Sequence, residues 1–335
     1  MMHHWRPWLE SALARPNDAP RLCARLRHRS RPGVPQAFHE PTRAPLVGTI
    51  GKSLELVFTE VVADQGSSSI QLVAADRYFD SAPRPDAEVV DAGAFSLFVS
   101  RTPWSYYARP AISDPRPVTV AEVEALIDRC EERGVDLAIE WVHEIHPELA
   151  GLAARVGLEV THHALMVVTS EMPIRAAAIE GNVRFLSAED PALLQAQAVA
   201  AVSFGAGGTG TGPAGAADRE AAARNLAPEL TAHLRDRARR RLTITAVAET
   251  DDGVMAAGSY QPVGDTAEIL AVATLPVMRR RGLAAAVTAK LARHARENGV
   301  RLLILSAQND DVARVYERVG FHRIGTVCAA GRPGT

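Results

Sequence analysis

The strongest structural signal in this chain is Val272-Ala-Thr-Leu-Pro-Val-Met-Arg-Arg-Arg-Gly-Leu-Ala284. An apolar run leads into a turn at Pro276, and a cluster of arginines and Gly282 then precede a helix-forming run. This order predicts a strand that ends at the N-terminus of a helix, where unpaired N–H groups and the helix dipole attract anions. Gly282 lets the backbone approach a bulky anion, and the arginines add donors suited to phosphate. The segment therefore predicts an anion-binding site.

Spacing excludes two common nucleotide-binding loops. No Gly-x4-Gly-Lys-Ser/Thr string occurs, so a Walker A loop is excluded, and the single glycine of the turn does not fit Gly-x-Gly-x-x-Gly. The pattern present is Arg279-x-x-Gly282-x-Ala284. It resembles the pyrophosphate loop of the GNAT superfamily, the acyl-CoA-dependent N-acyltransferases.

The sequence after this loop extends the resemblance. Residues 283–298 carry apolar side chains at steps of four, which predicts a helix, and residues 301–306 predict a buried strand. Asn309 then predicts the cap of a last helix. The spacing is similar to the distal GNAT pattern, with valine in place of a small residue, at Asn309, Val312, Tyr316, Gly320 and Phe321.

The resemblance implies an α/β (α+β) fold with a mixed, mostly antiparallel sheet, splayed central strands and flanking helices. It also implies acetyl-CoA as the acyl donor, with the pantetheine arm along the strand edge 272–274 and a backbone N–H near Ala273 on the thioester carbonyl. The cofactor-binding residues expected on this basis are Val272, Ala273, Thr274, Arg279, Arg280, Arg281, Gly282, Leu283, Ala284 and Asn309. Asn309 is equally well explained as a simple helix cap.

Two side chains are candidates for proton transfer. Tyr316 occupies the family position of the general acid, and a phenol with a pKa of about 10 keeps its proton at pH 7 and can pass it to a leaving thiolate. Glu268 precedes Arg279 by eleven residues, which resembles the placement of the catalytic glutamate in histone-type GNAT enzymes. The alternatives are a core tyrosine for Tyr316, and a solvated carboxylate or an anchor for the substrate amine for Glu268.

Tyr260 and Phe204 are the candidate substrate contacts. Tyr260 lies one predicted strand before Glu268 and is expected to reach the same cleft, whereas Phe204 ends a predicted helix over residues 190–204. The glycine-rich segment 205–212 follows this helix rather than a strand, so it does not predict a phosphate cradle. It is either a mobile lid over the acceptor or a plain linker. A further helix is predicted over 217–240, and strands over 182–186, 242–248, 254–260 and 266–274.

An internal repeat is indicated by two pairs of similar segments. Residues 134–141 (Gly-Val-Asp-Leu-Ala-Ile-Glu-Trp) parallel residues 299–306 (Gly-Val-Arg-Leu-Leu-Ile-Leu-Ser), and Val-Gly-Leu at 156–158 parallels Val-Gly-Phe at 319–321. More weakly, residues 98–109 align with residues 271–282. These matches predict two copies of one fold.

The first copy lacks the expected chemistry. In this alignment Tyr106 stands at the place of Arg279, Arg109 at that of Gly282, and Ala153 at that of Tyr316. We therefore predict a disordered basic arm over residues 1–44, a degenerate, non-catalytic GNAT-like domain over 45–170, and a catalytic GNAT domain over 171–335.

Composition limits the other function classes. The 335 residues suffice for two domains of about 100–200 residues, and a formal net charge of −2 favours neither nucleic acid nor a membrane surface. No apolar run approaches ~18 residues, so no membrane span is predicted. Three well-separated cysteines indicate a reducing cytoplasm rather than a disulfide framework. His143 and His146 have the wrong spacing for a zinc helix, and no metal is expected.

Three functions follow from the resemblance. The first is transfer of the acetyl group of acetyl-CoA to a primary amine of a small molecule or peptide, by direct attack in a ternary complex. The second is a specialised tandem GNAT enzyme that acts on a thiol cofactor or an aminoglycoside, and the third is a non-catalytic acyl-CoA sensor or scaffold. The sequence does not identify the acceptor. It also leaves the oligomeric state open, with a homodimer as one possibility.

Overall fold

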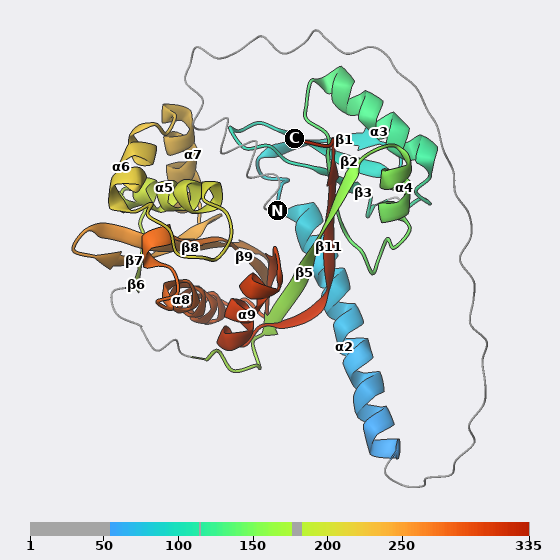
Figure 1. The fold of residues 1–335 in the computed structure, drawn as a ribbon. Helices are drawn as coiled ribbons and strands as arrows, with labels where there is room; N and C mark the ends of the chain where they lie inside the picture. Colours follow the sequence, from blue (N-terminus) through green and yellow to red (C-terminus); the bar gives the residue numbers. More distant parts are fainter. Residues whose placement is uncertain (1–53, 114, 176–182, 335) are drawn as a thin grey trace. The chain divides into compact units, whose positions relative to one another are not determined.

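The structure, a computed structural model, describes residues 54–113, 115–175 and 183–334. These residues form one sheet of eleven strands with helices against it (Figure 1). The first half comprises α2 (Leu54–Ser81), β1 (Ala87–Ala92), β2 (Phe95–Ser100), β3 (Ala108–Pro110), α3 (Val120–Arg133), β4 (Ala138–Val142), α4 (Leu149–Arg155) and β5 (Glu159–Thr169). The second comprises β6 (Val183–Phe185), α5 (Ala192–Gly205), α6 (Ala216–Arg224), α7 (Pro228–Arg239), β7 (Ile244–Thr250), β8 (Gly253–Val263), β9 (Thr266–Thr274), the 3-10 turn η1 (Pro276–Met278), α8 (Leu283–Glu297), β10 (Leu302–Ala307), α9 (Asp310–Val319) and β11 (His322–Gly331).

The sheet order is β1-β2-β3-β4-β11-β5-β10-β9-β8-β7-β6. Two pairs are parallel, β3 with β4 and β9 with β10, and the other pairs are antiparallel. The mixed, mostly antiparallel sheet predicted from the sequence is therefore confirmed. The last strand of each half pairs with a strand of the other half. β5 of the first half pairs with β10, and β11 of the second half pairs with β4 (Figure 1).

Alternation along the strands divides the core into two layers. In β10, Leu303 packs with residues of α8 and α9, whereas Ile304 packs with Tyr78 and Phe79 of α2. Successive strand residues point to opposite faces, so α8 and α9 cover one face, and the C-terminal part of α2 covers the other. On that second face α5 packs against β7 and β8. The two faces matter because the catalytic candidates divide between them.

The two halves repeat one order of elements. In each half, three strands are followed by a helix, a strand, a short helix and a long strand: β1 to β5 in the first, β7 to β11 in the second. The short helices α4 and α9 both end before a glycine with positive φ, Gly157 and Gly320. Ala153 lies four residues before the first glycine, as Tyr316 lies before the second.

The weakest alignment of the sequence analysis is wrong. Residues 98–109 run from β2 into β3, whereas residues 271–282 run from β9 to the start of α8. The counterpart of the turn before α8 is instead the segment that directly precedes α3 and ends at Thr119. Tyr106 and Arg109 therefore do not occupy the places of Arg279 and Gly282. The alignment failed because a shared proline and an apolar run do not identify which strand of a sheet they belong to.

The other predicted elements agree closely with the structure, except for one helix. Residues 217–240 form two helices, α6 and α7, because Pro228 starts a new helix and holds Ala227 extended at φ −61° and ψ 140°. The predicted boundary near residue 170 coincides with the end of β5, although one sheet runs through both predicted domains. The predicted arm over residues 1–44 lies outside the described residues.

Candidate active site

The turn between β9 and α8 has an unusual backbone. Gly282 is the N-cap of α8 with φ 80°, and Arg280 also has a positive φ of 63°. A non-glycine residue in this region costs on the order of 1–3 kcal/mol, and such strain is concentrated at functional sites. The turn thereby aims the first turn of α8 outward.

The N-terminus of α8 is open to an anion. The N–H of Ala286 donates to the carbonyl of Gly282 at 3.0 Å, so the amides of residues 283–285 precede the first intrahelical bond. Gly282 offers no capping side chain, and the first turn contains no acidic residue. These amides and the helix dipole therefore remain available to a ligand.

The corresponding helix of the first half is closed. Thr119 caps α3 by accepting a hydrogen bond from the N–H of Glu122. The carboxylate of Glu122, in the first turn, also accepts from the N–H of Ala94 at 2.9 Å. A side-chain cap and a negative charge thus occupy the place that α8 leaves open to an anion.

β9 and β10 separate about a third of the way along β9. Their parallel pairing covers Thr266, Ala267 and Glu268 and stops there. A bulge follows, because Ala271 has φ 54° and the register with β8 shifts between Ala257 and Ser259. The edge of β9 that faces β10 is therefore open over residues 272–274, as expected for splayed strands.

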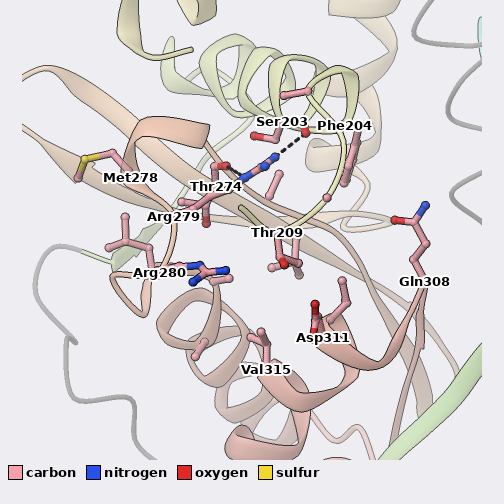
Figure 2. A pocket seen from close by; sticks show the side chains of 18 of the residues that line it. Ser203, Phe204, Thr209, Thr274, Met278, Arg279, Arg280, Gln308, Asp311 and Val315 are labelled. Atoms are coloured by element: carbon pink, nitrogen blue, oxygen red, sulfur yellow. Dashed lines mark hydrogen bonds between the residues drawn. The ribbon is translucent and has the colours of Figure 1, made fainter. Parts of the chain in front are cut away.

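A cavity of about 980 Å³ lies over this opening (Figure 2). Its walls come from the end of α5, the following glycine-rich loop, the end of β9, the start of α8, and α9. Of the expected site residues it is lined by Phe204, Val272, Ala273, Thr274, Arg279, Arg280, Gly282, Leu283, Ala284 and Tyr316. Arg281 and Asn309 do not line it, and Asn309 caps α9 by accepting from the N–H of Val312 at 3.0 Å.

The cavity is lined by more positive than negative charge. Besides Arg279 and Arg280, α9 contributes Arg314 and Arg318, and the single carboxylate among the lining residues is Asp311, which pairs with Arg314 at 2.6 Å. The sequence analysis missed the two α9 arginines. Both lie two positions from Tyr316, and residues at i and i+2 do not share a helix face, so no local signal placed them at the cavity with Tyr316.

The side chain of Arg279 is not directed at open solvent. It donates to four backbone carbonyls, at 2.7 Å to Ser203, 2.9 Å to Gly207, 2.9 Å to Gly210 and 3.3 Å to Thr274. Figure 2 shows the bonds to Ser203 and Thr274. Arg279 thus ties the end of β9 to the loop that follows α5.

Tyr316 lines the cavity from α9 and is only 7% exposed. Its ring packs edge-on against Phe321 at 6.2 Å between centroids. Burial raises the pKa of Tyr316 above its ordinary value, so the phenol stays protonated at neutral pH. A protonated phenol can donate a proton to a leaving group that develops negative charge, although the raised pKa makes this phenol a weaker acid.

Glu268 lies on the opposite face of the sheet from Tyr316. Ala267 and Ile269 pack toward α8, so Glu268 between them points to the α2 face, at the last position paired with β10. It is 1% exposed, and burial raises the pKa of its carboxyl to about 8, with the nearby Glu140 adding to the shift. Within the described residues its Oε2 has no hydrogen-bond partner.

Tyr260 does not reach the same cleft as Glu268, contrary to the sequence prediction. Its ring packs in the core beneath α8, and its hydroxyl lies 2.9 Å from Nδ1 of His294. In the pairing of β8 with β9, Glu268 is opposite Gln261 rather than Tyr260. The two side chains therefore point to opposite faces, and Tyr260 is a core residue.

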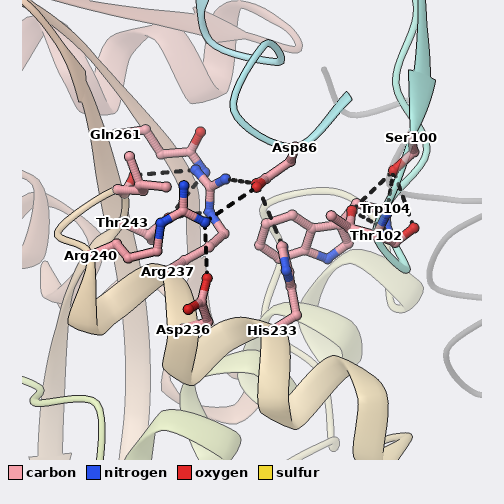
Figure 3. A network of polar contacts seen from close by, with 11 residues as sticks. Asp86, Ser100, Thr102, Trp104, His233, Asp236, Arg237, Arg240, Thr243 and Gln261 are labelled. Carbon is pink, nitrogen blue, oxygen red and sulfur yellow. Dashed lines mark hydrogen bonds and ion pairs between the residues drawn. The ribbon is translucent and has the colours of Figure 1, made fainter. Parts of the chain in front are cut away.

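A buried polar network braces α7 against the first half (Figure 3). Asp86 forms an ion pair with Arg237, and these side chains are 5% and 3% exposed. The guanidinium of Arg237 lies 5.4 Å from the ring centre of Trp104, whose ring in turn packs edge-on against His233 at 4.5 Å. The first half thus helps to fix a helix of the second half.

Two further classes of site are absent from the described part of the chain. None of its helices is long and apolar enough to cross a membrane. Likewise, residues 54–113, 115–175 and 183–334 contain no group of three or more His, Cys, Asp or Glu side chains arranged for a metal ion.

Comparison with known proteins agrees with this geometry. Residues 216–321 match the model of the Acetyltransferase (GNAT) family. A GCN5-related N-acetyltransferase from Kribbella flavida resembles the chain with a TM-score of 0.57 and 20% identity, over 79% of this chain and 96% of that one. A putative GNAT acetyltransferase from Novosphingobium aromaticivorans matches with a TM-score of 0.44 and 16% identity, over 72% of this chain and 89% of that one. No curated protein matches in sequence. The chain thus carries a GNAT acetyltransferase domain and has the fold of GNAT proteins.

Proposed function

We propose that this GNAT protein transfers the acetyl group of acetyl-CoA to a primary amine of a small molecule or peptide, by direct attack in a ternary complex. The observation that carries the proposal is the 980 Å³ cavity, which joins the open N-terminus of α8 to the open edge of β9. The amides of residues 283–285 and the surrounding arginines suit a pyrophosphate. The unpaired edge over residues 272–274 suits the amide groups of pantetheine, which can bind as an added strand does.

In this proposal two residues on opposite faces of the sheet transfer protons, Tyr316 at the cavity and Glu268, which is buried and does not line it. In the proposed reaction the amine nitrogen attacks the thioester carbon, the C–S bond breaks, and a backbone N–H near Ala273 stabilises the carbonyl oxygen. Glu268, when ionised, accepts a proton from the amine on one face. Tyr316 donates a proton to the thiolate on the other face and is reprotonated from solvent. This division places acceptor and donor on either side of the opening between β9 and β10.

We further propose that the first half does not catalyse the reaction. The support is the closed N-terminus of α3 and Ala153 at the position that corresponds to Tyr316. Its role in this proposal is to supply β5 to the second half and to brace α7 through Asp86. A tandem GNAT enzyme specialised for a thiol cofactor or an aminoglycoside fits the same arrangement. A sensor without catalysis would not need a buried phenol at the cavity.

The test is release of free thiol from acetyl-CoA in the presence of a panel of primary amines. We expect amine-dependent release by the wild type and a loss of turnover of about 10²- to 10⁴-fold in Tyr316→Phe. Acetyl-CoA affinity should be unchanged in this variant, because the ring remains. Tyr260→Phe is the matched control, since it removes a buried hydroxyl from the core and should keep full turnover. Equal turnover by Tyr316→Phe would refute the acid assignment, and binding without turnover for any amine would favour the sensor.

A further inference from the structure

The glycine loop, residues 205–212, is held over the cavity mainly by one side chain. Arg279 bonds to the carbonyls of Gly207 and Gly210 within the loop and of Ser203 just before it. The described residues provide Gly210 with no other hydrogen-bond partner. Since Gly205, Gly207, Gly208 and Thr209 line the cavity, Arg279 holds one of its walls in place.

The hydrogen bonds from Arg279 to these carbonyls form a clasp on the loop, and the sequence of the loop makes this clasp necessary. Gly207 and Gly208 adopt positive φ values of 64° and 55°, and a chain so rich in glycine loses much conformational entropy on ordering. The far end of the loop is fixed separately, because the N–H of Gly212 donates to the carbonyl of Pro276 at 3.2 Å. The middle of the loop depends on Arg279.

The guanidinium is well suited to joining the loop to the anion site. All four acceptors around it are neutral carbonyls, so within the described residues no carboxylate neutralises its charge. Its backbone belongs to the turn that leads into α8, one residue before the strained Arg280. A ligand that fixes this turn therefore also fixes the base of the clasp.

We propose that Arg279 is a positioning residue that clasps the glycine loop and couples its order to occupation of the anion site at α8. The coupling to acetyl-CoA rests on the proposed function, whereas the clasp itself does not. Because coupling between two sites is reciprocal, an ordered loop strengthens donor binding by the same factor. This role differs from the direct phosphate contact expected from the sequence.

The test measures hydrogen exchange at the amides of Ala206 and Gly207, each of which donates a backbone hydrogen bond. We compare the wild type, Arg279→Ala, Arg279→Lys and, as a matched control, Arg224→Ala on exposed α6. Without ligand, both Arg279 variants should exchange at least about tenfold faster than the wild type and the control, since several hydrogen bonds are lost. Acetyl-CoA should slow exchange in the wild type and control but not in the Arg279 variants.

Arg279→Lys separates the clasp from a simple charge effect. Lysine keeps the charge but cannot match the planar fork of arginine on four carbonyls, so it should leave the loop open. It should weaken acetyl-CoA binding only by the factor by which acetyl-CoA slows loop exchange in the wild type. Wild-type exchange rates in both Arg279 variants would overturn the clasp. If the wild type binds acetyl-CoA without added loop protection, the coupling is wrong. If it does not bind acetyl-CoA, the proposed function fails while the ligand-free comparison still tests the clasp.

Discussion

At the scale of single residues, the proposed reaction depends on two buried acids with opposite tasks. Tyr316 must keep its proton until a thiolate forms, and burial ensures this by raising its pKa, which also makes the phenol a weaker acid. Glu268 must lose its proton to act as a base, and burial opposes this by raising its pKa to about 8. In the proposed reaction Glu268 therefore acts as a base under mildly alkaline conditions, and its burial destabilises the folded protein wherever the unfolded chain is ionised at this position.

This burial predicts how Glu268 affects stability as the pH changes. Between the ordinary glutamate pKa of about 4.3 and the folded value of about 8, the unfolded chain is ionised at this position while the folded chain is not. The wild type should thus lose stability as the pH rises through this window. Glu268→Gln does not titrate, so its midpoint of thermal unfolding relative to the wild type should rise from pH 5 to 8 and level off above. A difference that is independent of pH would show that Glu268 is not buried as described.

At the scale of elements, the bulge in β9 depends on a close contact beneath α8. A Cβ built on Gly258 would lie 3.0 Å from Val287, 3.1 Å from Val272 and 3.2 Å from Leu291. Glycine is needed here because the helix approaches the sheet next to the open edge of β9. The bulge and α8 therefore constrain one another.

Gly258→Ala should destabilise the fold by about 1–3 kcal/mol, because core overpacking displaces its neighbours. Gly151→Ala is the matched control, since this helical glycine has open space around its Cβ position. Alanine there should stabilise α4 by about 0.5–1 kcal/mol. Denaturant unfolding compares the two variants, and equal effects of the same sign would refute the close contact.

At the scale of the whole molecule, the two halves are joined by exchanged strands and by the pair of Asp86 with Arg237. Removing one partner of a buried pair leaves an uncompensated charge and typically costs about 3–5 kcal/mol. We expect this loss for Asp86→Asn and for Arg237→Gln. The double variant should lose less than the sum, as measured by denaturant unfolding in a double-mutant cycle. Additive losses, or separate unfolding of the two halves, would contradict the coupling.

Local signals sufficed for β7 to β9, α8 and the cap at Asn309, because turns, periodicity and capping act over a few residues. Local signals could not reveal that β5 pairs with β10 and β11 pairs with β4, since strand pairing between distant segments leaves no local pattern. The face of the sheet to which Tyr260 points was predicted wrongly, because the face on which a strand residue lies depends on the register of the strand. The role of Arg279 depends on a loop about seventy residues away in sequence, which no motif records.

The most direct test of the account is acetyl-CoA binding to Ala284→Glu, measured by calorimetry and thermal unfolding. Ala284 is the second residue of α8, where a carboxylate suits the helix dipole but repels an anionic ligand. Ala121→Glu makes the same change at the second residue of α3, in the half proposed not to bind. The account predicts that both variants fold, that Ala121→Glu binds like the wild type, and that Ala284→Glu loses binding and the ligand-induced rise in midpoint. Undiminished binding by Ala284→Glu would contradict the anion site at α8, and with it the proposed function.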